Sequence, residues 1–117
     1  MTAMTLYHNP RCSKSRSALQ LLEDRGLSPT IVRYLETPLN AEQLQELLDR
    51  LGIPARQLLR TGEDEYKSLG LNDPQLTNAQ LIDAMVGQPK LIERPILVVG
   101  DKAVIGRPPE NILEILP

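Results

Sequence analysis

The sequence predicts an α/β fold in which a βαβ unit opens the chain, helices fill the middle, and a β-hairpin and a terminal helix close it. Three observations predict it: short β-branched or apolar runs near both ends, apolar stripes at helical spacing between them, and a composition that is 41% hydrophobic and 24% charged. The 117 residues suit one domain over 1–117. Because Phe and Trp are absent, its core must be aliphatic.

The first 35 residues predict the opening unit. Residues 5–8 form a short strand that ends at Asn9-Pro10, and apolar residues over 18–22 then recur at helical spacing until Gly26. Residues 30–35 are β-branched and lie between prolines, which predicts a second strand. A helical crossover joins the two strands, so they should be parallel.

The middle of the chain predicts four helical segments. The two clearest begin with a capping box, in which Asn40 pairs with Gln43 and Thr77 pairs with Gln80. Gly52 ends the first of these helices. The four segments cover 40–51, 54–59, 63–69 and 77–86.

A hairpin and a short helix are predicted at the end. Two apolar runs, 96–99 and 103–105, flank the turn signal Gly100-Asp101, and Pro108-Pro109 then introduces the terminal helix. The resulting order, βαβ then ββα, is the layout of a thioredoxin-like fold. In that layout the loop after the first strand lies at the carboxyl end of the sheet, where ligands collect.

Composition excludes several classes of protein. The 13 Lys and Arg residues against 15 Asp and Glu residues argue against a nucleic-acid partner. No apolar run is long enough to cross a bilayer and the start does not resemble a signal peptide, so we expect no membrane association and a cytoplasmic location. One cysteine and one histidine make a metal site improbable, and no motif for a bound cofactor is present.

The candidate chemistry gathers around Cys12. The thiol stands at the start of a predicted helix, with His8 before it and the cationic side chains of Arg11, Lys14 and Arg16 around it. Free backbone N–H groups and positive charge stabilise a thiolate and also attract an oxyanion. His8 would tune the thiolate by a hydrogen bond or by charge, or else be a structural group. The alternative for the cysteine is a buried, inert thiol.

Spacing narrows the reaction type. Cys12-x-x-Ser15 lacks a second thiol, so a resolving thiol must come from another molecule. Ala18 stands where a phosphatase loop of the Cys-x5-Arg type would carry arginine. Three further arginines beside turns or prolines either converge on an oxyanion or lie at the surface: Arg60, Arg94 and Arg107.

Four ordered motifs around the cysteine resemble those of a known family, the glutaredoxin-coupled, ArsC-type arsenate reductases. The resemblance runs essentially from end to end. The motifs are His8-Asn9-Pro10-x-Cys12-x-x-Ser15-Arg16, Leu58-Leu59-Arg60, Arg94-Pro95-Ile96 and Arg107-Pro108.

The resemblance implies an enzyme in which Cys12 attacks arsenate with the help of His8. Glutathione, as co-substrate, would then reduce the arsenic, and glutaredoxin would resolve the mixed disulfide. Pro95 would be the cis-proline opposite the cysteine. Gly106 is a departure, because some family members carry a cysteine at that position. The substrate-binding residues implied are Arg60, Arg94, Arg107, Ser15 and Arg16.

Two other functions remain open from the sequence. A monothiol, glutaredoxin-like oxidoreductase would also carry Cys12-x-x-Ser15 on this fold. An Spx-like regulatory binding protein shares the fold as well, but such regulators usually carry a Cys-x-x-Cys pair, so Ser15 counts against that function.

Overall fold

The computed structural model describes residues 3–116, which divide into two compact units. The first unit holds the described residues up to Thr37 and those from Arg94 onward, and the second unit is Pro38–Glu93. Whether the two units act as one domain, as the sequence predicts, stays a prediction.

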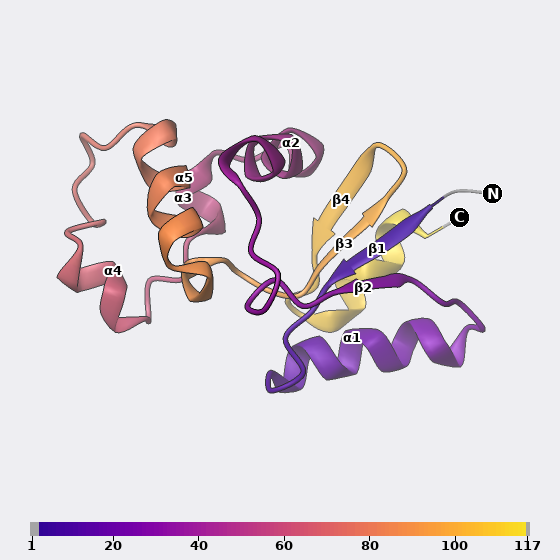
Figure 1. Cartoon of the computed structure of the whole chain (residues 1–117). Helices are drawn as coiled ribbons and strands as arrows, with labels where there is room; N and C mark the ends of the chain where they lie inside the picture. Colours follow the sequence, from indigo (N-terminus) through magenta and orange to yellow (C-terminus); the bar gives the residue numbers. More distant parts are fainter. Residues whose placement is uncertain (1–2, 117) are drawn as a thin grey trace. The chain divides into compact units, whose positions relative to one another are not determined.

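The first unit is built on a four-stranded sheet in the order β2-β1-β3-β4 (Figure 1). β1 is parallel to β2 and antiparallel to β3, and β3 is antiparallel to β4. The predicted βαβ unit and the predicted hairpin are therefore confirmed, and with them the thioredoxin-like fold class. The strands are β1 (Met4–Tyr7), β2 (Thr30–Val32), β3 (Ile96–Val99) and β4 (Lys102–Ile105).

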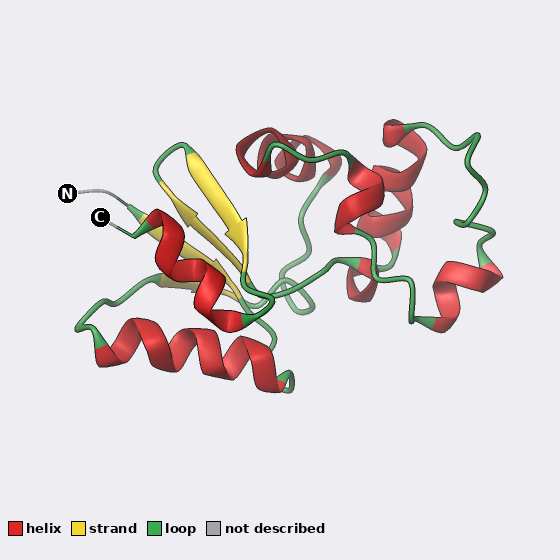
Figure 2. Cartoon of the chain, turned by 180° about the vertical axis from the view of Figure 1, so that it is seen from behind, coloured by secondary structure: helices red, strands yellow, loops and turns green. Residues whose placement is uncertain are grey.

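Two helices cover one face of this sheet, α1 (Ser13–Asp24) and the 3-10 helix η2 (Pro109–Ile115) (Figure 2). Their apolar sides meet the sheet in one aliphatic cluster, in which each buried leucine contributes roughly 1.5–3 kcal/mol. This packing fixes the start of α1 relative to the strand that precedes it. The buried members of the cluster are Leu6, Ala18, Leu22, Leu97, Val99 and Ile112.

The second strand is shorter than the predicted range 30–35. It ends after Thr30–Val32 because the chain turns there, and the carbonyl of Arg33 accepts a hydrogen bond from the N–H of Glu36 at 2.9 Å. Tyr34 belongs to this turn and is only 1% exposed. Tyr34 is therefore a large side chain buried in a turn, which the sequence pattern does not distinguish from a strand residue.

The second unit is helical, as predicted. Both capping boxes are present, with the Asn40 side chain accepting from the Gln43 N–H at 2.8 Å and Thr77 accepting from Gln80 at 3.2 Å. Gly52 ends the first helix in a left-handed conformation, with φ of 69°. The helices are α2 (Ala41–Leu51), α3 (Ala55–Leu58), α4 (Asp64–Ser68), α5 (Asn78–Gly87) and the 3-10 helix η1 (Pro89–Leu91).

The η1 helix was not predicted, and it leads into an isolated bridge between Ile92 and Leu59. Over residues 3–116, none of the helices has both the length and the apolar character that crossing a bilayer requires.

Candidate active site

Strand register brings four chain segments to one end of the sheet in the first unit. Tyr7 pairs with Val32 on one side and with Ile96 on the other, and Ile96 also pairs with Ile105. The residues just beyond these positions must therefore lie at the same sheet edge. They are His8 after β1, Arg33 after β2, Arg94-Pro95 before β3, and Gly106-Arg107 after β4.

Cys12 is the N-cap residue of α1, at this same edge. Its N–H donates to the carbonyl of Asn9 at 3.0 Å, and its carbonyl accepts from the N–H of Arg16 at 3.0 Å. The thiol makes no capping hydrogen bond, and the first turn of α1 carries no acidic residue. The free N–H groups and the positive end of the helix dipole therefore lie at the end of α1 that begins with Cys12, where they can bind an anion.

A short hydrogen-bonded chain behind the loop involves His8 and Ser15. The Ser15 Oγ is fully buried and accepts the N–H of Asn9 at 3.0 Å. The same oxygen lies 2.6 Å from His8 Nδ1, so the hydroxyl hydrogen is available to donate to that nitrogen. The buried hydroxyl thus holds the strand end, the loop and the helix together.

Burial lowers the pKa of His8, and the charges of Arg33 and Arg16 lower it further. The imidazole is therefore neutral at pH 7 and contributes no positive charge to the thiol. Within residues 3–116, no hydrogen bond joins the ring to Cys12. The sequence suggested that His8 tunes the thiolate by charge or by a hydrogen bond. A neutral ring does not supply the charge, and the hydrogen bond observed joins the ring to Ser15.

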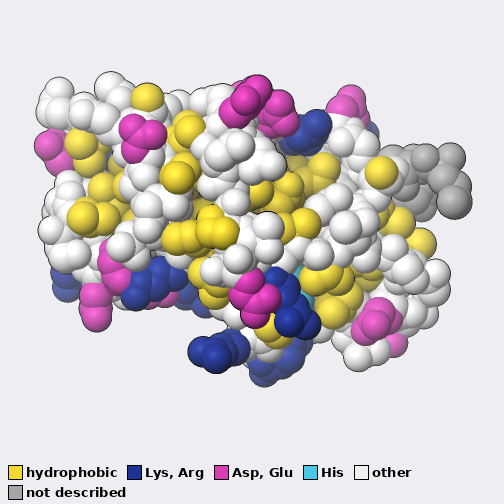
Figure 3. All heavy atoms as spheres, viewed as in Figure 1, with side chains coloured by type: hydrophobic (Ala, Val, Ile, Leu, Met, Phe, Trp, Pro, Cys, Tyr) yellow, Lys and Arg dark blue, Asp and Glu magenta, His cyan; other side chains and the backbone are white. Residues whose placement is uncertain are grey.

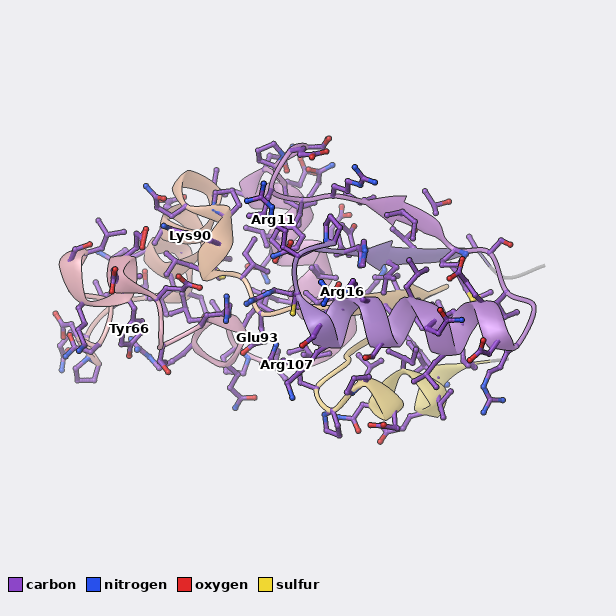
Figure 4. All side chains as sticks on the ribbon, turned by 90° about the horizontal axis from the view of Figure 1, so that it is seen from below. Arg11, Arg16, Tyr66, Lys90, Glu93 and Arg107 are labelled. Atoms are coloured by element: carbon purple, nitrogen blue, oxygen red, sulfur yellow. The ribbon has the colours of Figure 1, made fainter. Side chains whose placement is uncertain are left out.

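Arginines shape the rest of the loop. Arg16 is exposed on the first turn of α1, and its Nη1 donates to the carbonyl of Pro10 at 2.9 Å (Figure 4). The N–H of Arg11 donates to the Asn9 side chain at 3.0 Å. Both contacts fix the loop conformation in front of Cys12, and the first holds the cationic side chain of Arg16 against the loop.

Arg94 is the most unusual side chain at this edge. Its Nε and Nη1 atoms are buried, and neither has a hydrogen-bond partner among the described residues. Its carbonyl accepts from Arg107 Nη1 at 3.2 Å, so the two arginines hold each other in place. Burying these two N–H nitrogens without acceptors removes hydration that a bound anion would replace.

Two proline peptide bonds frame these arginines. The Arg94–Pro95 bond is cis, and so is the Arg107–Pro108 bond, which the sequence analysis did not single out. Gly106 packs against the first proline, and a Cβ atom built there would lie 2.9 Å from Pro95 Cγ. This contact explains why glycine suits a position at which the resemblance allows a cysteine.

Arg60 lies in the second unit, whereas the other predicted site residues lie in the first. Its Nη1 donates to Glu63 Oε1 at 2.6 Å, and its Nε lies 3.5 Å from Glu93 Oε1. Its N–H donates to the carbonyl of Leu91 at 2.8 Å. The side chain is thus already held by two carboxylates. The spacing of Glu63, three residues after Arg60, is a signal that the sequence analysis missed; no local signal points to Glu93.

The arrangement in the first unit supports nucleophilic chemistry on a small anion. It combines an accessible thiol at a helix N-terminus, a buried guanidinium with unused donors and a neutral imidazole. Among residues 3–116, His, Cys, Asp and Glu side chains form no group of three or more that could hold a metal ion.

Comparison with known proteins agrees with this arrangement. The sequence model of the ArsC family matches residues 7–115. The chain is 56% identical over 112 residues to the uncharacterized protein YfgD of Escherichia coli K12, covering 95% of this chain and 94% of that one. It is 49% identical to an arsenate reductase of Haemophilus influenzae, covering 97% and 99%. The solved structure of an arsenate reductase from Vibrio cholerae superposes with a TM-score of 0.96 at 48% identity, covering 98% of each chain.

The family match spans both the loop of Cys12 and the segment of Arg94 and Arg107, which are the parts that the strand register brings to one edge. On sequence and on fold, this chain belongs to the ArsC family.

Proposed function

We propose that this protein reduces arsenate to arsenite, with the Cys12 thiolate as the nucleophile and with glutathione and glutaredoxin as the source of electrons. The observation that carries the proposal is the guanidinium of Arg94, whose buried Nε and Nη1 have no acceptor in the described residues. It lies at the sheet edge that also carries the helix N-terminus of Cys12. The family relatives named as arsenate reductases support the same substrate.

The first step forms a bond between Cys12 Sγ and arsenic. The thiolate attacks pentavalent arsenic, and an arsenate oxygen leaves as water after protonation. Arg94 and the first-turn N–H groups of α1 would carry the negative charge of the remaining oxygens, which is the usual role of such donors. Arg107 holds the Arg94 carbonyl and so keeps this donor set in position.

The second and third steps need two external thiols, since Cys12 is the only cysteine of the chain. A glutathione thiolate attacks Cys12 Sγ, an S–S bond forms, and the electron pair of the S–As bond passes to arsenic, which leaves as arsenite. A glutaredoxin thiolate then attacks the glutathione sulfur of the mixed disulfide and releases the Cys12 thiolate. Two thiols are thereby oxidised to one disulfide for each arsenate reduced.

The test is arsenate-dependent oxidation of NADPH in the presence of glutathione, glutaredoxin and glutathione reductase. We expect turnover with the wild-type chain and none with Cys12→Ser. Full turnover by Cys12→Ser would refute the proposal. Ser13→Ala is the matched control, because Ser13 is exposed and follows directly on the thiol.

The same reaction mixture separates the alternative oxidoreductase. A monothiol, glutaredoxin-like enzyme would reduce a glutathione mixed disulfide and would show no rate that depends on arsenate. That pair of results would replace the proposal, whereas a rate that saturates with arsenate supports it.

A further inference from the structure

A cavity of about 240 Å³ opens beside the loop that leads to Cys12. Its walls are residues 8–11 of the loop together with Arg33, Leu35 and Glu36 from the turn after β2, all in the first unit. Figure 3 shows the only histidine of the chain just reaching the surface, with basic and acidic side chains beside it. None of the steps at Cys12 described so far uses this cavity.

Opposite charges stand at a fixed spacing on one wall. Arg33 Nη1 lies 3.9 Å from Glu36 Oε2, and the side chains are 56% and 69% exposed. The turn between them is held by the hydrogen bond from the Glu36 N–H to the Arg33 carbonyl at 2.9 Å. Such a long, exposed pair contributes little to stability. Each side chain can therefore turn from its neighbour toward a ligand at little cost.

The other walls add an imidazole ring, a second arginine and an apolar surface. His8 contributes its imidazole to the lining, and the contact of Nδ1 with Ser15 fixes the position of the ring. Arg11 also lines the cavity, and its backbone N–H donates to the Asn9 side chain. Leu35 supplies an apolar side that is 43% exposed. A cation, an anion and an apolar wall within one small cavity match an α-amino acid group, which carries a carboxylate, an ammonium and a short methylene chain.

We propose that this cavity binds the γ-glutamyl end of glutathione, with Arg33 on the α-carboxylate and Glu36 on the α-ammonium. The inference rests on the proposed function, in which glutathione attacks at Cys12. The volume is below the roughly 300–1,000 Å³ of pockets that enclose a whole ligand, and so it suits one end of a tripeptide.

The position of the cavity suits delivery of the thiol. In glutathione the cysteine is bonded directly to the γ-glutamyl group, and residues 8–11 of the cavity wall run directly into Cys12. Binding of the γ-glutamyl end here holds the glutathione thiolate near Cys12 Sγ and so raises the effective concentration of that thiolate. The glutathione thiolate then attacks Cys12 Sγ, the S–S bond forms, and the S–As electron pair passes to arsenic.

Two variants of the full chain test the assignment by kinetics. Arg33→Ala removes one charge-assisted contact, so we expect KM for glutathione to rise on the order of 10-fold while KM for arsenate stays unchanged. Glu36→Gln should raise KM for glutathione by a smaller factor. The matched control is Arg50→Ala, which opens another exposed arginine–glutamate pair, on α2 at 4.0 Å from Glu46, and should change neither constant.

A binding measurement separates this inference from the proposed function. S-methylglutathione cannot react, so its Kd can be measured by titration calorimetry without arsenate. We expect weaker binding to Arg33→Ala, and we expect Glu36→Gln to bind S-methylglutathione no better than an analogue that lacks the α-amino group.

Three outcomes overturn the inference while the proposed function stands. The first is that Arg33→Ala keeps its turnover on arsenate with unchanged KM for glutathione and unchanged Kd for S-methylglutathione. The second is that Arg33→Ala changes KM for arsenate instead of KM for glutathione. The third is that Arg50→Ala raises KM for glutathione as much as Arg33→Ala does. Absence of arsenate-dependent turnover in the wild-type chain overturns the proposed function alone, because the binding of S-methylglutathione is measured separately.

Discussion

Arginines at the sheet edge of the first unit and in the helical second unit have opposite surroundings. Arg94 keeps two buried guanidinium nitrogens without acceptors in the described residues, whereas Arg60 is bound by the carboxylates of Glu63 and Glu93. Lys90 in the second unit likewise contacts Glu65, which lowers the pKa of that carboxyl (Figure 4). Carboxylates therefore neutralise these cations within the second unit, whereas the charge of Arg94 in the first unit stays available. An anionic substrate needs the available charge.

Removing the unpaired charge should have the largest effect on catalysis. Arg94→Ala is expected to lower kcat/KM for arsenate by on the order of 10²-fold, since its donors would act on charge that develops in the transition state. Because two of the lost nitrogens are buried without acceptors in the described residues, the thermal midpoint should not fall.

Steady-state kinetics and thermal unfolding check both parts of this expectation. Arg25→Ala is the control, because Arg25 is exposed at the far end of α1. An unchanged kcat/KM in Arg94→Ala would remove this arginine from the site and erase the contrast with Arg60.

Adding one carbon atom at Gly106 should destabilise the sheet edge. A Cβ atom would lie 2.9 Å from Pro95 Cγ and 3.1 Å from Ile112 Cγ2, both in a packed region. We expect Gly106→Ala to lower the free energy of unfolding by about 1–3 kcal/mol, as overpacking does, and to reduce turnover by displacing Arg94.

The second unit offers the matched control for that substitution. A Cβ at Gly62 would meet nothing within 4 Å, so Gly62→Ala should leave stability and turnover nearly unchanged. Equal losses in denaturant unfolding of the two variants would contradict the packing argument.

Arg60→Ala should cost less activity than Arg94→Ala. Its guanidinium is committed to two carboxylates, so we expect a decrease in kcat/KM of less than about 10-fold, together with a loss of stability on the order of 1 kcal/mol from the broken, partly buried pair. Kinetics and unfolding of Arg60→Ala and Glu63→Gln measure both effects. A decrease as large as that of Arg94→Ala, without loss of stability, would assign Arg60 to the substrate.

The smallest expected effect is on the pH dependence of stability. Burial lowers the pKa of His8, so the unfolded chain binds a proton that the folded chain resists. Stability should then decline as the pH falls through about 6.5, the ordinary histidine value, toward the lower pKa of the folded state. Urea unfolding between pH 7.5 and 5.5 should show this slope for the wild type and a flatter one for His8→Gln. Equal slopes would mean that His8 is not desolvated as described.

Local signals in the sequence predicted most of the fold. The capping boxes of Asn40 with Gln43 and of Thr77 with Gln80 join residues three positions apart, so the sequence alone identifies them. The predicted end of β2 was wrong because Tyr34 is buried in a turn, and a residue buried in a turn can be as large and apolar as one in a strand. The η1 helix was missed because it is a single 3-10 turn.

The candidate site was predictable only in part. The place of Cys12 at a helix start follows from the strand, loop and helix pattern, and the structure bears it out. Two other contacts depend on the folded chain. They are the pairing of Arg60 with Glu93 and the placing of Glu36 beside Arg33 by a turn, and the residue spacing did not identify either as part of a site. That two guanidinium nitrogens of Arg94 lack acceptors is likewise a property of packing.

The most direct test of the sheet-edge anion site is the rate at which iodoacetamide alkylates Cys12, with and without arsenate, in the wild type and in Arg94→Ala. We predict that arsenate slows the reaction of the wild-type thiol in a saturable way and that Arg94→Ala loses this protection. An alkylation rate that arsenate leaves unchanged in the wild type would contradict an anion site formed by Arg94 beside the thiol.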